Sequence, residues 1–283
     1  MKKMNILVDE IYDEERDLYH ISNTKIFKCE FAGKRDGESV LKECRNIHVL
    51  ESVFDLRYPL WHINHTYIEN TTFKEGSRAP MWYGKHIDIC KTKIYPVKAI
   101  RECVDVRIRD SEIKSNEFGW KNKDMDISNS YIESEYAFLE SKNMKLDKVM
   151  LKGKYSFQYV KNVLIENSSF DTKDAFWHSK NVTVKNSEIK GEYLGWFSDS
   201  LTLINCKIIG TQPLCYCKNL KLIDCEMVNA DLSFEYSEVD AVVKGHIDSI
   251  KNPKSGTIKV DSVGEIIKSD AVMECNAKII LNH

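Results

Sequence analysis

The chain has 283 residues, 42% of them hydrophobic, and its 41 basic and 43 acidic side chains give a formal net charge of −2. This composition can build a hydrophobic core and excludes wholesale disorder. The near-zero charge and the lack of a basic block argue against a nucleic-acid partner.

The N-terminal residues and the cysteine content bear on the cellular compartment. The apolar run at positions 6–8 has only three residues, too few for a signal-peptide core. No stretch approaches the roughly 20 apolar residues of a membrane span. Nine cysteines, an odd number without framework spacing, fit a reducing compartment. We therefore expect a cytoplasmic protein with no membrane partner.

Residues 1–22 precede a repeated pattern that begins at residue 23, and they carry an acidic run at 13–17. Stacked repeats need terminal segments that cover the open strand edges. We expect this segment to be an N-terminal cap.

Residues 23–247 contain twelve copies of a nine-residue pattern, most of them spaced 19 residues apart. The clearest copies are 162–170, 181–189, 200–208 and 219–227. The fourth position is always aliphatic, as in Ile165 and Val184, and the ninth is always large and apolar, as in Phe170. Polar residues alternate with these positions, which is typical of a strand with one buried face.

Asn or Asp stands at the sixth position of seven copies, including Asn167 and Asn186. These residue types tolerate the left-handed backbone of a tight corner. A strand, a corner and a second strand in each short repeat predict one coil of a solenoid. Periods of six or five residues, which left-handed hexapeptide helices and pentapeptide repeats require, are absent. We predict an all-β, single-stranded right-handed parallel β-helix of about 12 coils.

Residues 248–283 follow the last copy and contain a Pro-Gly turn at 252–256 between two apolar runs. We expect this segment to be a C-terminal cap. The whole chain, 1–283, is then a single β-helix domain with a cap at each end.

The remaining side of each coil holds most of the aromatic residues. All five tryptophans stand four residues before the following copy: Trp61, Trp82, Trp120, Trp177 and Trp196. Neighbouring columns hold Tyr58, His62, Tyr136, Tyr155 and Tyr193. If this side is a strand, small residues beside the tryptophans favour tryptophans pointing inward and tyrosines pointing outward, and the reverse parity exposes the tryptophans.

Either parity leaves a strip of aromatic residues on one face. Large apolar patches mark binding surfaces, and sugar C–H faces pack on aromatic rings. We expect these ten residues to bind substrate, an oligosaccharide in this interpretation. The alternative is that a terminal segment or a second copy of the chain covers the strip.

Three residues on this side are candidates for catalysis. Asp174 lies between Tyr155 and Tyr193 of the adjacent coils, an apolar setting that would raise its pKa. His178 follows four residues later, about 13 Å away on an extended strand. Glu140 shares the column of His178, beside Glu102 and Lys121. The structural alternative for the two acids is solvation or charge pairing at the edge of the strip.

Other polar residues suggest less specific chemistry. Arg57, Arg78 and Arg101 could neutralise a uronic-acid carboxylate or simply pair with nearby acids. Cys206 and Cys225 are consecutive members of an interior column and fit small buried thiols. His65 and His86 stack without an evident third ligand. We predict no metal site and no cofactor.

Several short motifs of the chain are specific in sequence. They are 58–61 (YPLW), 81–83 (MWY), 174–177 (DAFW), 191–196 (GEYLGW) and 234–237 (FEYS). These motifs closely resemble a bacterial family of unknown function, the domain of unknown function 3737. The resemblance covers nearly the whole chain. It implies a pectin-lyase-like right-handed β-helix, for which the label glycosyl hydrolase rests on the fold. It implies no catalytic residues.

The sequence thus favours a carbohydrate-binding or carbohydrate-acting β-helix. If the protein is an enzyme, Asp174 is the acid and His178 or Glu140 assists it. The alternative is a non-catalytic scaffold whose aromatic side docks a protein or forms a homo-oligomer.

Overall fold

The computed structural model describes residues 4–34 and 38–282, and it divides into two compact units, Met1–Met144 and Lys145–His283. Both units are stacks of parallel strands. Each unit is an all-β parallel solenoid with a period near 19 residues, with about 14 turns in the two units, which confirms the predicted fold class.

The described residues of unit 1, 4–34 and 38–144, contain fourteen complete strands and one 3-10 helix. These are β1 (Asn5–Val8), β2 (Ile11–Tyr12), β3 (Ser22–Phe27), β4 (Glu30–Phe31), β5 (Arg45–Leu50), β6 (Val53–Phe54), β7 (Asn64–Glu69), β8 (Thr72–Phe73), η1 (Glu75–Ser77), β9 (Lys85–Cys90), β10 (Lys93–Ile94), β11 (Val104–Arg109), β12 (Glu112–Lys114), β13 (Lys123–Ser128) and β14 (Tyr131–Ser134). The next strand, β15 (Lys142–Asp147), begins in unit 1 and ends in unit 2.

Unit 2 contains the remaining strands. These are β16 (Met150–Lys154), β17 (Lys161–Glu166), β18 (Ser169–Lys173), β19 (Lys180–Lys185), β20 (Glu188–Lys190), β21 (Asp199–Ile204), β22 (Lys207–Ile209), β23 (Leu220–Val228), β24 (Glu238–Lys251), β25 (Ser255–Ile267) and β26 (Lys278–Leu281).

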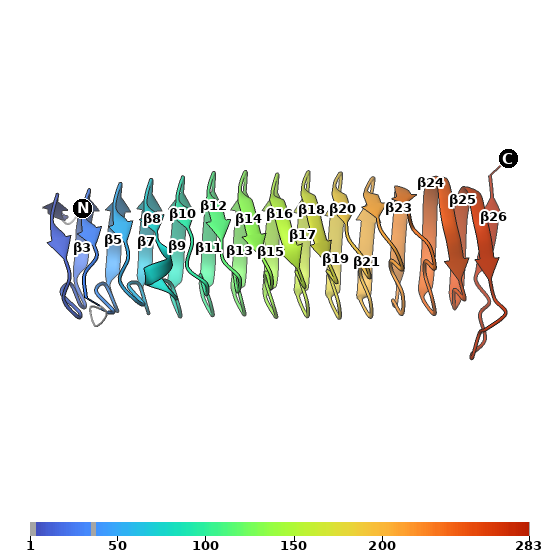
Figure 1. The fold of residues 1–283 in the computed structure, drawn as a ribbon, viewed down its shortest axis with the longest axis horizontal. Helices are drawn as coiled ribbons and strands as arrows, with labels where there is room; N and C mark the ends of the chain where they lie inside the picture. Colours follow the sequence, from blue (N-terminus) through green and yellow to red (C-terminus); the bar gives the residue numbers. More distant parts are fainter. Residues whose placement is uncertain (1–3, 35–37, 283) are drawn as a thin grey trace. The chain divides into compact units, whose positions relative to one another are not determined.

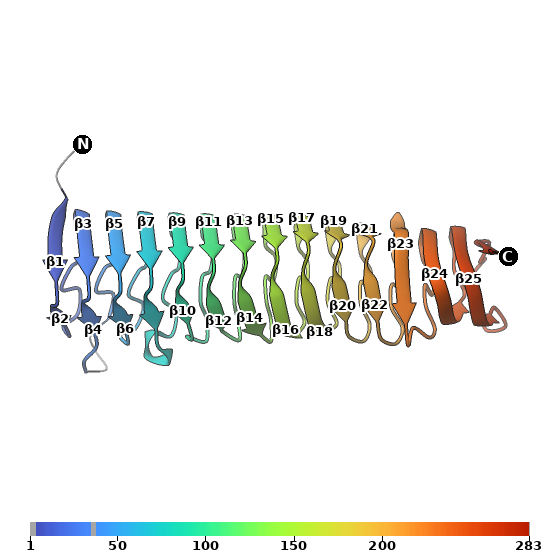
Figure 2. The same ribbon diagram turned by 90° about the horizontal axis from the view of Figure 1, so that it is seen from above.

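Two rows of strands run through each unit, as Figures 1 and 2 show. In unit 1 the longer, odd-numbered strands β3, β5, β7, β9, β11 and β13 form one row. The shorter, even-numbered strands β4, β6, β8, β10, β12 and β14 form the other row. Each strand pairs in parallel with the equivalent strand one coil away, so Val106 faces Ile87 on one side and Met125 on the other. Like residues therefore stack on like residues, as the repeat predicts.

The corner between the two rows lies at the predicted position. Asn70, Asn167, Asn186 and Asn205 all have a positive φ near 50°, the left-handed conformation that asparagine tolerates. The small residues after the corner point inward and form a hydrogen-bonded ladder. The Ser111 hydroxyl accepts from the Thr92 N–H at 3.1 Å and donates to the Arg109 carbonyl at 2.7 Å.

The fourth and ninth positions of the repeat form the core. Phe31, Phe54 and Phe73 stack with ring centroids 4.3 and 4.7 Å apart and are fully buried. The fourth position is buried in eleven of the twelve copies, but Val242 is 39% exposed. The structure pairs Leu222 with Ala241, which is 4% exposed, so Ala241 takes the inward place and Val242 is the next residue along the strand.

Parallel strand pairing extends into both terminal segments that were predicted to be caps. β1 pairs with β3 and β2 pairs with β4, so residues 5–12 form a coil within the predicted cap 1–22. β25 and β26 continue the stack within the predicted cap 248–283. Residues 1–3 and 283 of these two segments lie outside the described residues. The terminal coils were not among the twelve predicted coils because they lack the nine-residue pattern.

The third side of the coil is not a strand, so neither predicted parity is right. Asp174, Phe176 and His178 all have positive φ values of 53–63°, and Asp174, Ala175 and Phe176 are all buried. Side chains alternate between faces only along an extended backbone. The left-handed residues turn Phe176 inward, where it stacks on Phe157 with centroids 4.9 Å apart.

Candidate functional site: an aromatic side with a buried carboxyl group

The five tryptophans lie half-buried on the third side and are fixed by hydrogen bonds. Each indole N–H donates to a main-chain carbonyl of the following coil. The acceptors in unit 2 are Tyr193 for Trp177 and Gln212 for Trp196, both at 2.7 Å. The acceptors in unit 1 are Ala79 for Trp61, Lys98 for Trp82 and Tyr136 for Trp120, at 2.8, 3.0 and 2.5 Å. The indoles are therefore held rigidly against the coil surface.

In unit 2 a ladder of aromatic rings runs beside the tryptophans, exposed in its first three members and half-buried in its last two. Its members are Tyr159, His178, Phe197, Tyr216 and Tyr236, and all but the last are near-parallel to their neighbours. The His178 ring lies between Tyr159 and Phe197, at centroid distances of 4.9 and 5.0 Å and interplanar angles of 8°. Because both faces of the imidazole are covered, a ligand on this surface meets ring edges.

Asp174 directly follows β18 and lies beside this ladder. Its main-chain N–H donates to the Glu192 carbonyl at 2.9 Å, and its own carbonyl accepts from the Gln158 amide at 3.5 Å. The residue is only 6% exposed. No hydrogen bond reaches the carboxyl group from the described residues. Burial raises the pKa of Asp174, the nearby Lys173 ammonium opposes the shift, and Glu192 adds to it.

Lys173 and Glu192 complete the surroundings of this carboxyl group. They occupy the same column one coil apart, and their charged groups pair at 2.9 Å. The Lys173 ammonium also lies 5.2 Å from the centre of the Tyr193 ring. Its pKa is raised, chiefly by the hydrogen bond to Glu192. Sequence reasoning missed both residues, although their 19-residue spacing was visible.

The structure brings one group of predicted residues together in unit 2. Asp174 lies among Trp177, Tyr193 and Tyr155, whose N–H donates to the Lys173 carbonyl at 2.8 Å, and Trp196 stacks on Trp177 at 5.4 Å. His178 is near in sequence but belongs to the aromatic ladder. We call Tyr155, Asp174, Trp177, Tyr193 and Trp196 the Asp174 face.

The other predicted residues lie in unit 1. Tyr58 packs on Trp61 at 4.9 Å, and Trp61 stacks on Trp82 at 5.2 Å. His62 stacks on Tyr83 at 5.0 Å. Tyr136 is 39% exposed and packs edge-on against Trp120.

Glu140 also belongs to unit 1, so the structure does not place it with Asp174. Its carboxylate pairs with Lys121 at 3.8 Å. This is the charge pairing that the alternating column suggested.

Among the other polar residues, Arg57 pairs with Glu38 at 3.8 Å, and Arg78 ends η1 with a positive φ. His65 and His86 stack at 4.4 Å, and His86 pairs with Asp105 at 2.8 Å. No cluster of three His, Cys, Asp or Glu side chains suited to a metal ion occurs among residues 4–34 and 38–282.

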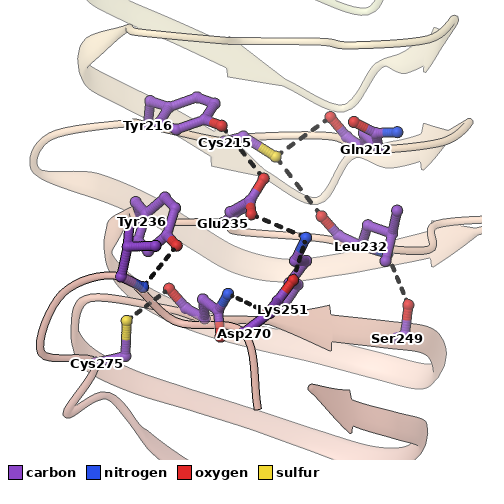
Figure 3. A network of polar contacts seen from close by, with 12 residues as sticks. Gln212, Cys215, Tyr216, Leu232, Glu235, Tyr236, Ser249, Lys251, Asp270 and Cys275 are labelled. Atoms are coloured by element: carbon purple, nitrogen blue, oxygen red, sulfur yellow. Dashed lines mark hydrogen bonds and ion pairs between the residues drawn. The ribbon is translucent and has the colours of Figure 1, made fainter. Parts of the chain in front are cut away.

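Hydrogen bonds and ion pairs connect the C-terminal segment to the end of the ladder that contains Tyr216 and Tyr236 (Figure 3). Tyr216 donates to Glu235 at 3.3 Å, and the Val272 N–H donates to the Tyr236 hydroxyl at 3.2 Å. Lys251 bridges Glu235 and Asp270 at 3.1 and 3.0 Å. Hydrogen bonds to Asp270 and Glu235 raise the pKa of Lys251, so this end of the ladder is held by a charged network.

Two shallow grooves lie elsewhere, over β21 to β25. Their volumes are about 370 and 470 Å³, and they are lined by residues such as Lys221 and Asp240. None of the predicted site residues lines them. In the part of the chain that the structure describes, no helix is long and apolar enough to cross a membrane.

Solved structures with a similar fold include three parallel β-solenoid proteins from other sources. A tailspike protein of the E. coli bacteriophage HK620, solved with a hexasaccharide, has a TM-score of 0.54 and 10% identity over 99% of this chain and 72% of the tailspike chain. The Streptococcus pneumoniae surface adhesin PfbA has a TM-score of 0.40 and 10% identity, over 99% and 83% of the two chains. A mannuronan C-5 epimerase module from Azotobacter vinelandii has a TM-score of 0.37 and 9% identity, over 86% and 90%.

The likeness to the tailspike concerns the fold alone, since the identity is only 10%, and it confirms the predicted right-handed parallel β-helix. The comparison with curated proteins gives no significant match. Residues 5–280 match the profile of a family described as "Protein of unknown function (DUF3737)". The match covers nearly the whole chain, so the protein belongs to this family.

Proposed function

We propose that the protein binds an extended carbohydrate across the Asp174 face. The observation that carries this proposal is Asp174, a residue that is 6% exposed and whose carboxyl group receives no hydrogen bond from the described residues. A partly desolvated carboxyl group without donors is less stable than a hydrogen-bonded one. A ligand that supplies hydroxyl donors removes this cost, and sugars present such donors in pairs.

The surroundings of Asp174 favour the same class of ligand. Indoles and tyrosine rings fixed on the surface provide apolar contact at little cost in conformational entropy. The adjacent ladder exposes ring edges, which carry partial positive charge and suit the oxygen atoms of a sugar. The structure most similar in fold among those described above, the tailspike, was solved with a hexasaccharide, which supports the proposal.

Binding, rather than cleavage, is the function proposed for this face. Glycoside hydrolysis needs a second carboxylate at about 5 to 9.5 Å. The acid beside Asp174 is Glu192, which is already paired with Lys173 at 2.9 Å. His178, the other predicted helper, is stacked between two rings.

A thermal-shift screen against neutral and acidic oligosaccharides tests the proposal. A ligand at about one hundred times its Kd adds about 2.7 kcal/mol of stability, which such a screen detects. We expect a reproducible shift that Tyr155→Ala reduces. If no oligosaccharide shifts the transition and the chain self-associates through this side, the face is a docking surface and the proposal fails.

A further inference from the structure

Between Trp61 and Trp120, the tryptophan column of unit 1 contains one cation. Trp61, Trp82, Arg101 and Trp120 occupy equivalent positions in successive coils, and Arg101 forms parallel bridges with both Trp82 and Trp120. Its guanidinium carbon lies 5.0 Å from the centre of the Trp82 ring and 5.3 Å from that of Trp120. The stack thus continues through Arg101, but with a positive charge in place of an indole.

The hydrogen-bonding capacity of this guanidinium is unused. Its Nε atom is buried and has no hydrogen-bond partner. Glu102 lies 3.4 Å from Nε without making a hydrogen bond. The other guanidinium nitrogens donate no hydrogen bond to any of the residues that the structure describes. Arginine carries five N–H donors in one plane, and two indoles here cover the faces of that plane.

A guanidinium with covered faces can bind only acceptors that lie in its own plane. The side chain keeps 23% of its surface exposed, so its edge reaches solvent between the indole edges. A carboxylate is planar and matches the fork of two parallel N–H groups. A tetrahedral sulfate or phosphate matches a flat slot less well.

We propose that Arg101 is a carboxylate-binding site, flanked by Trp82 and Trp120, that takes the acidic group of a uronic-acid residue. The inference rests on the proposed carbohydrate binding and adds a ligand class to it. Glu102 opposes the binding of an anion because its own negative charge lies next to the same guanidinium.

The matched variant for this site is Arg101→Trp. It continues the indole column that Trp82 and Trp120 already form, so the fold keeps its stacking while the cation is lost. Urea unfolding of this variant, compared with the wild type, verifies that the fold is intact. Glu102→Gln removes the competing charge and leaves Arg101 in place.

The experiment is isothermal titration at low salt with oligogalacturonate and with its neutral methyl ester. We expect the wild type to bind the acid at least tenfold more tightly than the ester. Arg101→Trp abolishes this difference, and Glu102→Gln increases it several-fold. An Arg101→Trp chain that keeps the preference, or a wild type that binds no oligogalacturonate, overturns the inference.

The same titrations separate this inference from the proposed function. Asp174→Asn weakens the binding of the neutral ester if the Asp174 face binds sugar. If Asp174→Asn weakens binding of the ester but Arg101→Trp does not change the affinity for the acid, only the proposed Arg101 site is wrong. If Arg101→Trp abolishes binding of the acid and the ester does not bind the wild type at all, the proposal that the Asp174 face binds carbohydrate is wrong.

Discussion

The third side of the coil carries different chemistry in the two units, although both use the same backbone. In unit 1 the tryptophan column includes Arg101, and the column after it continues from Tyr83 into Glu102, Lys121 and Glu140. In unit 2 the tryptophan column is followed by a column of five rings, and a buried carboxyl group lies beside it.

The difference shows how stacking sets the chemistry of a solenoid surface. Each position repeats one coil later, so a column of like residues makes a continuous stripe. A single substitution within a column, Arg101 among indoles or Asp174 between tyrosines, then places one charge in an apolar stripe. Arg101 has an ion-pair partner in Glu102, and the Asp174 carboxyl group receives no hydrogen bond from the described residues.

The largest effect that we predict concerns the interior of unit 2. Phe176→Ala should lower the free energy of unfolding by about 3–5 kcal/mol, because Phe176 is 1% exposed and stacks on Phe157. Phe197→Ala, in the exposed ladder at 44% exposure, is the control and should cost about 1 kcal/mol or less. Urea unfolding measures both. Equal losses would mean that the ladder, and not the interior, stabilises this side.

The next prediction compares the loss of stability on replacing Asn122 and Ser179, two residues of one buried column. Asn122 accepts from the Cys103 N–H at 2.8 Å and donates to the Ile100 carbonyl at 3.2 Å. Asn122→Ala leaves both groups unpaired and should cost about 2–4 kcal/mol. Three coils later, the Ser179 hydroxyl is buried without a hydrogen bond, so Ser179→Ala should change the stability by less than about 0.5 kcal/mol. A larger loss from the serine variant would contradict this account.

The next, smaller effect tests whether the indole N–H hydrogen bonds hold the tryptophan side chains in place. Trp177→Phe removes the indole N–H that donates to the Tyr193 carbonyl at 2.7 Å and should cost about 1 kcal/mol in unfolding free energy. Trp82→Phe in unit 1 removes the equivalent bond at 3.0 Å and should cost a similar amount. If neither variant is destabilised in urea, the indoles are not held by these bonds.

The smallest effect depends on pH. The pKa of Asp174 is raised in the folded chain, so its contribution to stability is complete below the unfolded value of 3.8 and is lost as the pH rises through the folded value. Asp174→Asn does not titrate. Its stability relative to the wild type should therefore increase between acidic and neutral pH, and urea unfolding along a pH series measures the change. A difference that stays flat with pH would show that the carboxyl group is solvated.

The repeat period predicted most of the fold, because stacked columns leave a direct trace in the sequence. Asn167 and its equivalents marked the corners, and Ile165 and its equivalents marked the core. The terminal coils could not be predicted in this way. In them β1 and β26 are held by backbone pairing to a neighbour, which imposes no residue pattern.

The third side was predicted less well, because period-two alternation assumes an extended backbone. The signal for the actual geometry was present in one column, where Gly119 and Gly195 stand on either side of three phenylalanines. Both glycines have φ values near 75°, and Phe176 in the same column has a φ of 63°. Glycine at equivalent positions indicates a left-handed backbone, and that backbone turns Phe176 into the core.

The most direct test of the central claim is an isothermal titration of the oligosaccharide that gives the largest thermal shift. Three chains are compared: the wild type, Asp174→Asn, and Asp171→Asn as the matched control. Asp171 is an exposed acid of the same unit that pairs with Lys190 at 3.1 Å. We predict that Asp174→Asn weakens binding at least tenfold, while Asp171→Asn binds like the wild type. Equal affinity of all three chains would contradict the assignment of the Asp174 face as the carbohydrate site.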